Sequence, residues 1–448
     1  MTALIEPKVL KGFRDFLPRA EMVRRNLTEK IEASFRSFGF VPIDTPALEY
    51  AEILLGKGGG ETEKQIYRFR DNGERDVALR FDLTVPFARF VARHQGEIAF
   101  PFKRYHIGKV WRGENTQQGR YREFTQCDFD IVGSDGPAAD FEILLMIHFT
   151  LQSLGVAAGI RLNHRGLFNR FLEHCGAREQ SVDILRAVDK IAKIGVDETR
   201  RVLVDIAGDS NAAQILDFIG AGAAAGGFGE TLDRLTALSG GPSPESERLA
   251  LLRRFMLDTG TEDVFSLDPS ITRGLDYYTG VVFETFLAEL PGIGSICSGG
   301  RYDNLAGLYS KTAISGVGSS IGLDRMIAAL ESLGRLPGAA GFARAAIACG
   351  RAEDAGKYQA LAEQFRQAGI PCEVFLEAPP DGKPVKQFML AEQKGLPFVI
   401  IPGADPLKDL LTVRIIAERR NCEGLSVAAA AGIIGGVCGG EVPASAAG

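Results

Sequence analysis

The chain has 448 residues, of which 45% are hydrophobic and 24% are charged, and its formal net charge is −6. At roughly 150 residues per domain this length allows two to four domains, and the apolar content excludes a disordered chain. The seven cysteines are too few and too scattered for a disulfide scaffold, which favours reduced thiols in a cytoplasm. No apolar run is long enough for a membrane span, and the charge balance gives no global attraction to nucleic acid or anionic membranes.

The first third of the chain predicts one long helix and a pair of long strands. Apolar residues recur at every fourth position from Leu27 to Phe35, which is typical of an amphipathic helix over residues 19–38. An extended segment then runs to Pro46, and the glycines at 58–60 predict a loop. The other predicted strands are 77–81, 104–112 and 121–132. Residues 86–92 predict the start of a second helix, and residues 137–154 predict a third.

The middle of the chain has a different pattern. From about residue 165 to residue 260, short helical patterns alternate with Gly and Ser and strand signals are missing, which predicts a helical insertion or a separate helical domain. A strand is predicted over 275–286. Two glycine-rich stretches, 294–300 and 316–322, each indicate the approach to a further element, and the second leads into a helix over 323–333.

The C-terminal part follows a linker rich in Gly, Ala and Pro at residues 336–344. Strands and helices then alternate, which indicates a small α/β domain with a largely parallel sheet. The predicted strands are 345–349, 372–376, 398–401 and 412–416, and the predicted helices are 355–367 and 385–394. The last residues, 439–448, are mostly small and predict disorder.

Three signals for other chemistries are weak. Residues 318–322 fit the nucleophile-elbow pattern G-x-S-x-G, but the last histidine is His174, so no acid and histidine follow in hydrolase order. We favour a glycine-rich turn before a helix. No P-loop pattern occurs, so the sequence predicts no nucleotide site of that type. The five histidines show no metal-ligand spacing, so the metal ligands stay unknown.

The predicted strand 121–132 has two different faces when its residues are sorted by parity. The odd positions are mostly apolar, namely Thr125, Cys127, Phe129 and Ile131. The even positions carry an arginine, an aromatic ring, an amide and two carboxylates, namely Arg122, Phe124, Gln126, Asp128 and Asp130. The neighbouring strand end and loop add Arg112, Glu114 and Arg120. A solvated face is the alternative, but this combination fits a nucleoside triphosphate and a small amine.

Two further clusters carry charge beside aromatic or glycine residues. Residues 273–279 place an arginine and an aspartate next to two tyrosines, for which half-buried strand packing is an equal alternative. Residues 322–325 place Arg325 at a predicted helix start, where the helix dipole attracts anions. The alternative there is an arginine solvated in the first turn.

Taken in order, these motifs resemble the histidyl-tRNA synthetase family of class II aminoacyl-tRNA synthetases over essentially the whole chain. The matching segments are the first long helix up to Pro46 (motif 1), 112–124 (motif 2), 273–278 (the histidine signature), 299–303 and 316–325 (motif 3). The resemblance implies an α+β catalytic domain built on an antiparallel sheet, a helical insertion and a C-terminal α/β anticodon-binding domain. The implied bounds are 1–164 and 263–335 for the catalytic domain, 165–262 for the insertion and 345–437 for the anticodon-binding domain.

The resemblance also implies a role for each site residue. Arg112 is expected to hold the α-phosphate of ATP, and Arg273 to act on that phosphate and on the histidine carboxylate. The other expected ATP contacts are Glu114 at the adenine amino group, Phe124 stacked on the base, and Arg120 and Arg325 at the outer phosphates. The expected histidine contacts are Asp82, Thr84 and Gln126 at the α-amino group and Asp130, Tyr277 and Tyr278 around the imidazole.

The implied reaction forms histidyl-adenylate from ATP and L-histidine and then transfers the histidyl group to the terminal ribose of histidine tRNA. Neither step needs a protein nucleophile, because alignment and charge neutralisation by arginines and Mg²⁺ suffice. Neutral imidazole offers one N–H and one bare nitrogen, and a pocket that pairs both rejects unmatched side chains by about 10⁴ or more. The family also implies a homodimer and no membrane association.

Two alternatives come from other classes of protein. A regulatory subunit of ATP phosphoribosyltransferase is expected to lack active-site arginines and the anticodon domain, whereas Arg112, Arg273 and Arg325 are present. A synthetase-like tRNA sensor would need a kinase domain, for which the chain has no room. The motif 2 loop, 114–119, lacks the basic residue and proline found in many bacterial members. Whether the extra 5′ guanylate of the tRNA is required therefore stays open.

Overall fold

The computed structural model of the chain describes residues 4–56, 63, 65–116, 119–223, 227–271, 278–303, 307, 309, 313–337, 341–379 and 384–436. It forms two compact units, one made of Met1–Asp15 with Arg24–Pro337 and the other of Phe16–Val23 with Gly338–Gly448. Three sequence predictions fall outside the described residues: the glycine loop at 58–60, the histidine signature from Arg273 to Tyr277, and the tail 439–448.

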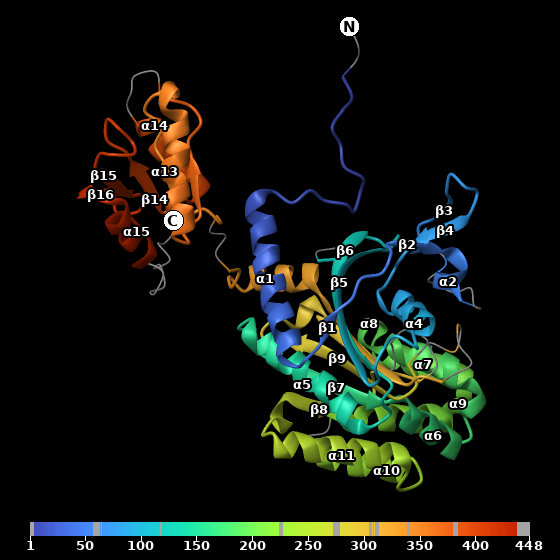
Figure 1. Ribbon diagram of the computed structural model, residues 1–448. Helices are drawn as coiled ribbons and strands as arrows, with labels where there is room; N and C mark the ends of the chain where they lie inside the picture. Colours follow the sequence, from blue (N-terminus) through green and yellow to red (C-terminus); the bar gives the residue numbers. More distant parts are fainter. Residues whose placement is uncertain are drawn as a thin grey trace. The chain divides into compact units, whose positions relative to one another are not determined.

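The first unit is built on a sheet of eight described strands in the order β1-β5-β6-β11-β10-β9-β7-β8. Figure 1 shows the long strands β5 and β6 of this sheet. The strands are β1 Val41–Pro42, β5 Phe102–Trp111, β6 Glu123–Val132, β7 Ala158–His164, β8 Phe265–Leu267, β9 Val281–Leu287, β10 Cys297–Tyr302 and β11 Gly316–Gly322. Neighbours run antiparallel except at the two edges, where β1 pairs with β5 and β8 with β7 in parallel. The predicted antiparallel catalytic sheet is therefore confirmed.

Three helices pack against strands of this sheet: α1 Pro18–Ser37, through Phe35, and α5 Pro137–Ser153 and α12 Leu323–Ser332. In α1 the residues Leu27, Ile31 and Phe35 are buried, as their four-residue spacing predicts. The ring of Phe35 lies 4.7 Å from that of Phe129, which belongs to the apolar face of β6. The odd-numbered face of β6 is thus part of the core, and its even-numbered face is left for the site.

A small antiparallel sheet, in the order β2-β4-β3, precedes the site segment. Its elements and the adjoining helices are β2 Leu48–Tyr50, α2 Ala51–Leu55, β3 Arg68–Arg70, β4 Asp76–Leu79 and α4 Thr84–Arg93. After β4 the buried Arg80 donates hydrogen bonds to the carbonyl oxygens of Thr45 and Lys109, 2.5 and 2.9 Å away. These bonds hold the segment after β4 against Thr45 and against β5, so that Asp82 and Thr84 lie at the face of the eight-stranded sheet.

The segment between β7 and β8 is helical, as predicted. Its helices are α6 Arg165–His174, α7 Ser181–Asp189, α8 Ile191–Ile194, α9 Val196–Gly220, α10 Phe228–Leu238 and α11 Pro244–Asp258. Phe171 and Phe218 stack with ring centroids 4.3 Å apart, and Phe168 meets Phe218 edge-on, which gives the helices a core of their own. Among the described residues, the helices are all too short or too polar to span a lipid bilayer.

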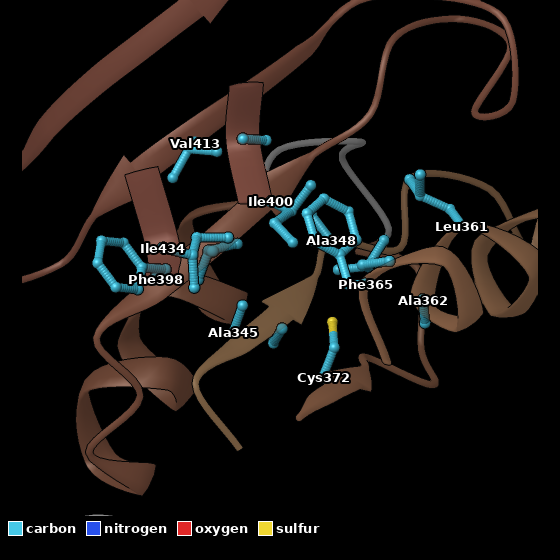
Figure 2. Close-up of a cluster of buried hydrophobic side chains, with 14 of the residues drawn as sticks. Ala345, Ala348, Leu361, Ala362, Phe365, Cys372, Phe398, Ile400, Val413 and Ile434 are labelled. Atoms are coloured by element: carbon cyan, nitrogen blue, oxygen red, sulfur yellow. The ribbon is translucent and has the colours of Figure 1, made fainter. Parts of the chain in front are cut away.

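The C-terminal unit contains a five-stranded sheet in the order β13-β12-β14-β15-β16. Its elements are β12 Ala345–Ile347, α13 Ala355–Gln367, β13 Cys372–Val374, α14 Val385–Lys394, β14 Phe398–Ile401, β15 Leu411–Ile415, β16 Arg420–Leu425 and α15 Val427–Gly436. Figure 2 shows the buried hydrophobic cluster that forms the core of this unit, with Phe365 of α13, Phe398 of β14 and Ile434 of α15 among its side chains. The predicted α/β domain is confirmed, but the sheet is mixed, because β15 and β16 run antiparallel to their neighbours.

One sequence prediction about glycine was wrong. Residues 318–322 were expected to form a turn before a helix, yet they belong to β11, which lies beside β10 in the middle of the large sheet. The reason is close packing between strands: a Cβ at Gly316 would lie 2.3 Å from the ring of Tyr302, and one at Gly299 would lie 2.2 Å from the carbonyl oxygen of Gly318. Glycine here gives room to neighbouring groups rather than freedom to the backbone.

Candidate active site

A cavity of about 330 Å³ lies over the even-numbered face of β6 and the adjoining strands β11, β10 and β9. Ten of the twelve predicted site residues line it: Asp82, Thr84, Arg112, Glu114, Arg120, Phe124, Gln126, Asp130, Tyr278 and Arg325. The other two, Arg273 and Tyr277, lie outside the described residues. Residues from six separate segments of the chain thus meet in one hollow.

Strand register explains why this face is open. Asp128 of β6 faces His106 of β5 on one side and Ser320 of β11 on the other, and Asp130 faces Arg104 and Gly318. The polar side chains of β5 and β6 therefore stand beside small residues on β11 and β10. This difference in side-chain size leaves the cavity above the small residues.

Three arginines gather at one end of the cavity. The Nε atom of Arg112 donates to the carbonyl oxygen of Phe81 at 2.8 Å, and its guanidinium lies 5.2 Å from the centre of the Phe124 ring. Arg120 lies 3.6 Å from a carboxylate oxygen of Glu114. Arg325 donates to the carbonyl oxygen of Ser295, and burial together with the positive charge of Arg120 lowers its pKa. An environment this positive favours a bound anion with several oxygen atoms.

Arg122 does not join this group, although parity placed it on the same face. Its Nε atom donates to the carbonyl oxygen of Glu114 at 3.2 Å, and its backbone N–H donates to that of Gly12 at 2.9 Å. A Cβ at Gly12 would lie 2.7 Å from the Arg122 side chain. Arg122 therefore clamps the N-terminal segment to the β5–β6 hairpin, just before β6 begins at Glu123.

The opposite end of the cavity holds three buried carboxyl groups, on Asp82, Asp128 and Asp130, which are at most 2% exposed. Burial raises the pKa of Asp82 to about 6 and that of Asp128 to about 7, with Arg112 and Arg104 opposing the shift at Asp82 and Arg104 opposing it at Asp128. Burial also raises the pKa of Asp130. Three acids so close together, with raised pKa values, suit a ligand that brings N–H donors or positive charge.

Asp130 is the most fully paired of these acids. One of its oxygens, Oδ2, forms an ion pair with the buried Arg104 at 2.5 Å. The other, Oδ1, accepts the hydroxyl of Tyr302 at 2.6 Å. Arg104 in turn stacks over Phe87 at 4.0 Å. Asp130 and Arg104 are therefore both held in place at the bottom of the cavity.

Four acceptor oxygens in the cavity have no hydrogen-bond partner among the described residues: Asp82 Oδ2, Gln126 Oε1, Asp128 Oδ1 and Asp130 Oδ2, the last of which meets Arg104 as an ion pair. The other groups of these side chains are fixed. Asp82 Oδ1 accepts the backbone N–H of Val85 at 3.1 Å, and the Gln126 amide donates to the Ser320 hydroxyl at 2.8 Å. Buried acceptors are costly when unpaired, so a ligand with several N–H donors is the group that this end can bind.

A buried carboxylate in the lining of the cavity joins motifs 2 and 3. Asp324, at the start of α12, receives Arg14 at 2.5 Å, Arg24 at 2.7 Å and the backbone N–H of Thr125 at 2.8 Å. The bond to Thr125 fixes β6 against the first turn of α12, which also carries Arg325. Asp324 has no role that the pattern of residues 322–325 could predict, because its partners lie about 200 and 300 residues away along the chain.

Four other residues of the site were missed or left without a role. Asp128 was placed on the correct face by parity, but Arg104, Tyr302 and Ser320 were not singled out. Sorting the residues of β5 by parity could have found Arg104, since it lies on the same face of that strand as Gly108. Within the described residues, no group of three or more His, Cys, Asp and Glu side chains is arranged to hold a metal ion.

An antiparallel sheet with arginines at one end of a cavity and buried acids at the other is the architecture expected of the catalytic domain of class II aminoacyl-tRNA synthetases. Comparison with known proteins agrees. The family model for histidyl-tRNA synthetase matches residues 12–326, and that for an anticodon-binding domain matches residues 345–434. The chain belongs to the histidyl-tRNA synthetase family.

Relatives and solved structures extend over most of the chain. It is 54% identical to the histidine–tRNA ligase of Treponema denticola, with 88% of this chain and 89% of that protein aligned. It is 47% identical to that of Rhodopirellula baltica, covering 90% and 91%. The crystal structure of histidyl-tRNA synthetase from Nostoc superposes with a TM-score of 0.82 at 31% identity, covering 96% and 99%.

One structural neighbour bears on the alternative of a regulatory subunit. A structure described as an ATP phosphoribosyltransferase regulatory subunit/histidyl-tRNA synthetase, from Bacillus halodurans, gives a TM-score of 0.71 at 20% identity, covering 86% of this chain and 97% of that chain. At that identity the likeness shows the fold alone. The regulatory alternative thus has less support than the ligase.

Proposed function

We propose that the chain ligates L-histidine to histidine tRNA at the expense of ATP, through a histidyl-adenylate formed in the cavity of the first unit. One observation carries the proposal: a single cavity has arginines at one end and unpaired buried acceptors at the other. Polyphosphate is the natural ligand of the first end, and an amino acid with N–H donors on both its α-amino group and its side chain is the natural ligand of the second. Family membership supplies the reaction that joins them.

The arginine end binds ATP. Arg112 is fixed by its bond to the carbonyl oxygen of Phe81 and points its remaining N–H groups at the α-phosphate. Arg120 and Arg325 bind the outer phosphates. Phe124 stacks on the adenine, and Glu114 accepts its amino group.

The acid end binds histidine. Asp82, Thr84 and Gln126 surround the α-ammonium group, and two of the three offer an unpaired buried acceptor. The expected imidazole pocket comprises Asp130, Tyr277 and Tyr278. Asp130 acts there through Arg104 and Tyr302, which it holds in place.

In the first step the histidine carboxylate oxygen attacks the α-phosphorus of ATP, and pyrophosphate leaves with the bonding electrons. Arg112 and Arg273 neutralise the charge that builds up on the α-phosphate. In the second step the tRNA ribose hydroxyl attacks the activated carbonyl, and AMP leaves. Mg²⁺ enters as part of the ATP complex, with phosphate oxygens as its main ligands. The chain contributes alignment and positive charge to both steps.

The other parts of the chain serve the tRNA. Residues 1–164 and 263–335 make up the catalytic domain, 165–262 form its helical insertion, and 345–437 form the anticodon-binding domain. Two copies associate through motif 1 as a homodimer. Since the product is a substrate of protein synthesis, the protein acts in the cytoplasm.

The proposal is tested by charging histidine tRNA transcripts with and without the additional 5′ guanylate. Radiolabelled histidine should become acid-precipitable only when ATP is present, and Arg112→Ala should reduce the rate by at least a hundredfold. The exposed Arg68→Ala is the matched control, since its charge pairs with Asp76 away from the cavity. Failure of the folded protein to charge either transcript would refute the ligase and favour the regulatory subunit.

A further inference from the structure

Arg14, in the segment before the first helix, lies between the two parts of the chain that carry the outer arginines of the cavity. Its guanidinium lies over the ring of Tyr121, 3.2 Å from the ring centre. Its Nη2 atom donates to a carboxylate oxygen of Asp324 at 2.5 Å. Tyr121 directly follows Arg120 in the chain, and Asp324 directly precedes Arg325. One side chain near the N-terminus thus contacts the neighbours of both arginines.

The two partners of Arg14 line the cavity, whereas Arg14 itself does not. The side chain of Arg14 is 32% exposed, and that of Asp324 is 4% exposed. Asp324 also pairs with Arg24 at 2.7 Å, so its carboxylate stays paired when Arg14 is replaced. Arg14 is therefore placed to act on the cavity through Tyr121 and Asp324, and its replacement leaves the buried ion pair behind them intact.

The backbone that carries Arg14 is fixed by the two residues before it. The carbonyl oxygen of Gly12 accepts the backbone N–H of Arg122 at 2.9 Å. The ring of Phe13 meets that of Tyr67 edge-on, with centroids 6.2 Å apart. These contacts give Arg14 a defined position relative to the β5–β6 hairpin, which is what a positioning residue needs.

Arg120, by contrast, is held loosely. Its ion pair with Glu114 spans 3.6 Å, and its side chain is 49% exposed. Burial and then the positive charge of Arg120 lower the pKa of Arg325, which shows that the two cations are close enough to repel each other. The hairpin nevertheless lies against α12, since a Cβ at Gly119 would be 3.5 Å from the Cα atom of Arg325. Contacts beside the two arginines have to hold them together against this repulsion.

We propose that Arg14 is a positioning residue for the outer phosphates of ATP. Its stacking on Tyr121 holds the hairpin that carries Arg120. Its ion pair with Asp324 holds the same hairpin against the start of α12, where Arg325 lies. Two arginines that are already in place lose less freedom when the polyphosphate binds between them, and the affinity for ATP rises accordingly. The inference rests on the proposed function, which makes ATP the ligand of this end.

The test separates ATP from histidine. In Arg14→Ala the Kd for ATP, measured by calorimetry, should rise roughly threefold to thirtyfold, and the KM for ATP in pyrophosphate exchange should rise by a similar factor. The KM for histidine should change by less than about twofold, because its expected contacts lie at the other end of the cavity. Absence of exchange in the unaltered protein would refute the proposed function alone, since ATP binding still reports the effect of Arg14.

Two further variants of the N-terminal segment serve as controls. Lys11→Ala removes an exposed positive charge from the same segment and should leave the Kd for ATP unchanged. Arg14→Lys keeps the charge that pairs with Asp324 but not the planar guanidinium, so it should retain the thermal stability of the unaltered protein and recover only part of the ATP affinity. Arg14→Lys also gives the readout if Arg14→Ala does not fold.

A double-mutant cycle shows whether Arg14 acts through Tyr121. Tyr121→Leu removes the ring, so adding Arg14→Ala to it should raise the Kd for ATP much less than Arg14→Ala does alone. Tyr121→Phe keeps the ring, and in that background Arg14→Ala should have its full effect. An unchanged Kd for ATP in Arg14→Ala, equal increases in KM for ATP and histidine, or a full effect in the Tyr121→Leu background would overturn the inference.

Discussion

Gly318 of β11 faces Asp130 of β6 so closely that a Cβ at position 318 would lie 1.9 Å from the Oδ1 atom of the carboxylate. That oxygen is the one that accepts the Tyr302 hydroxyl. The buried hydrogen bond between Asp130 and Tyr302 thus requires that residue 318, on the neighbouring strand, has no side chain. The glycines of the stretch that resembles motif 3 are therefore needed for packing at the end of the cavity that holds the buried acids.

The Gly318→Ala variant should therefore damage the site. The methyl group displaces the Asp130 carboxyl from Tyr302 and Arg104, which should lower the free energy of unfolding by about 1–3 kcal/mol and raise the KM for histidine. Denaturant unfolding and pyrophosphate exchange measure the two effects. Gly159→Ala on β7 is the control, because a Cβ there meets nothing within 4 Å. Equal behaviour of the two variants would show that the close approach is unimportant.

Asp128 should make the stability of the free protein depend on pH. Burial raises its pKa in the folded protein to about 7, above the ordinary value of 3.8 for an aspartate. The contribution of its proton is therefore complete below pH 4 and is lost as the pH rises through 7. Asp128→Asn carries no such charge, so its advantage in unfolding free energy should grow between pH 5 and pH 8 and reach on the order of 2–4 kcal/mol.

Urea unfolding at several pH values measures this advantage, with the exposed Asp183→Asn as the control. An advantage that is independent of pH would argue against a buried titrating carboxyl at residue 128. Greater stability in Asp128→Asn together with weaker histidine binding would mean that the unpaired acid is kept for function.

His164 should have the opposite pH dependence. It is the N-cap of α6, where Nδ1 accepts the backbone N–H of Gly166 at 3.1 Å, and burial lowers its pKa to about 4. Its contribution to stability is present above pH 6.5 and is lost as the pH falls through 4, because protonation removes the acceptor. His164→Asn keeps a capping oxygen without this proton.

Between pH 7.5 and pH 5 the unaltered protein should therefore lose about 2 kcal/mol that His164→Asn retains. Chemical denaturation at the two pH values provides the comparison. If both proteins lose the same amount, His164 is not the titrating group.

Asp324 should be needed both for folding and for catalysis. Replacing it with Asn leaves the buried Arg24 without its carboxylate, which should cost about 3–5 kcal/mol. Because Arg325 follows directly, the rate of adenylate formation should also fall, with the KM for ATP increased. Glu331→Gln, an exposed change on the same helix, should do neither. A stable and fully active Asp324→Asn would show that motifs 2 and 3 are held together by other contacts.

Local sequence patterns predicted the parts of the site that depend on one strand or one loop. The parity of residues 123–130 is a property of the strand alone, and it placed Phe124, Gln126, Asp128 and Asp130 correctly in the cavity. The charged hairpin gave Arg112, Glu114 and Arg120 in the same way. The roles of these residues stay predictions until they are tested.

The features that sequence patterns did not predict are set by distant contacts. Glycines in β10 and β11 resemble a turn signal unless Tyr302 and Asp130 are known to lie against them. Arg122 turns to the segment around Gly12, more than 100 residues away. Strand β16 was missed because its residues are mostly exposed and carry no apolar alternation, so only its pairing with β15 defines it.

The most direct measurement is ATP–pyrophosphate exchange by the purified protein with each of the twenty amino acids in turn. We expect exchange with histidine alone, and its loss in both Arg112→Ala and Arg273→Ala while circular dichroism shows that the variants are folded. Exchange with another amino acid, or none with histidine from a folded protein, would contradict the proposed adenylate chemistry in this cavity.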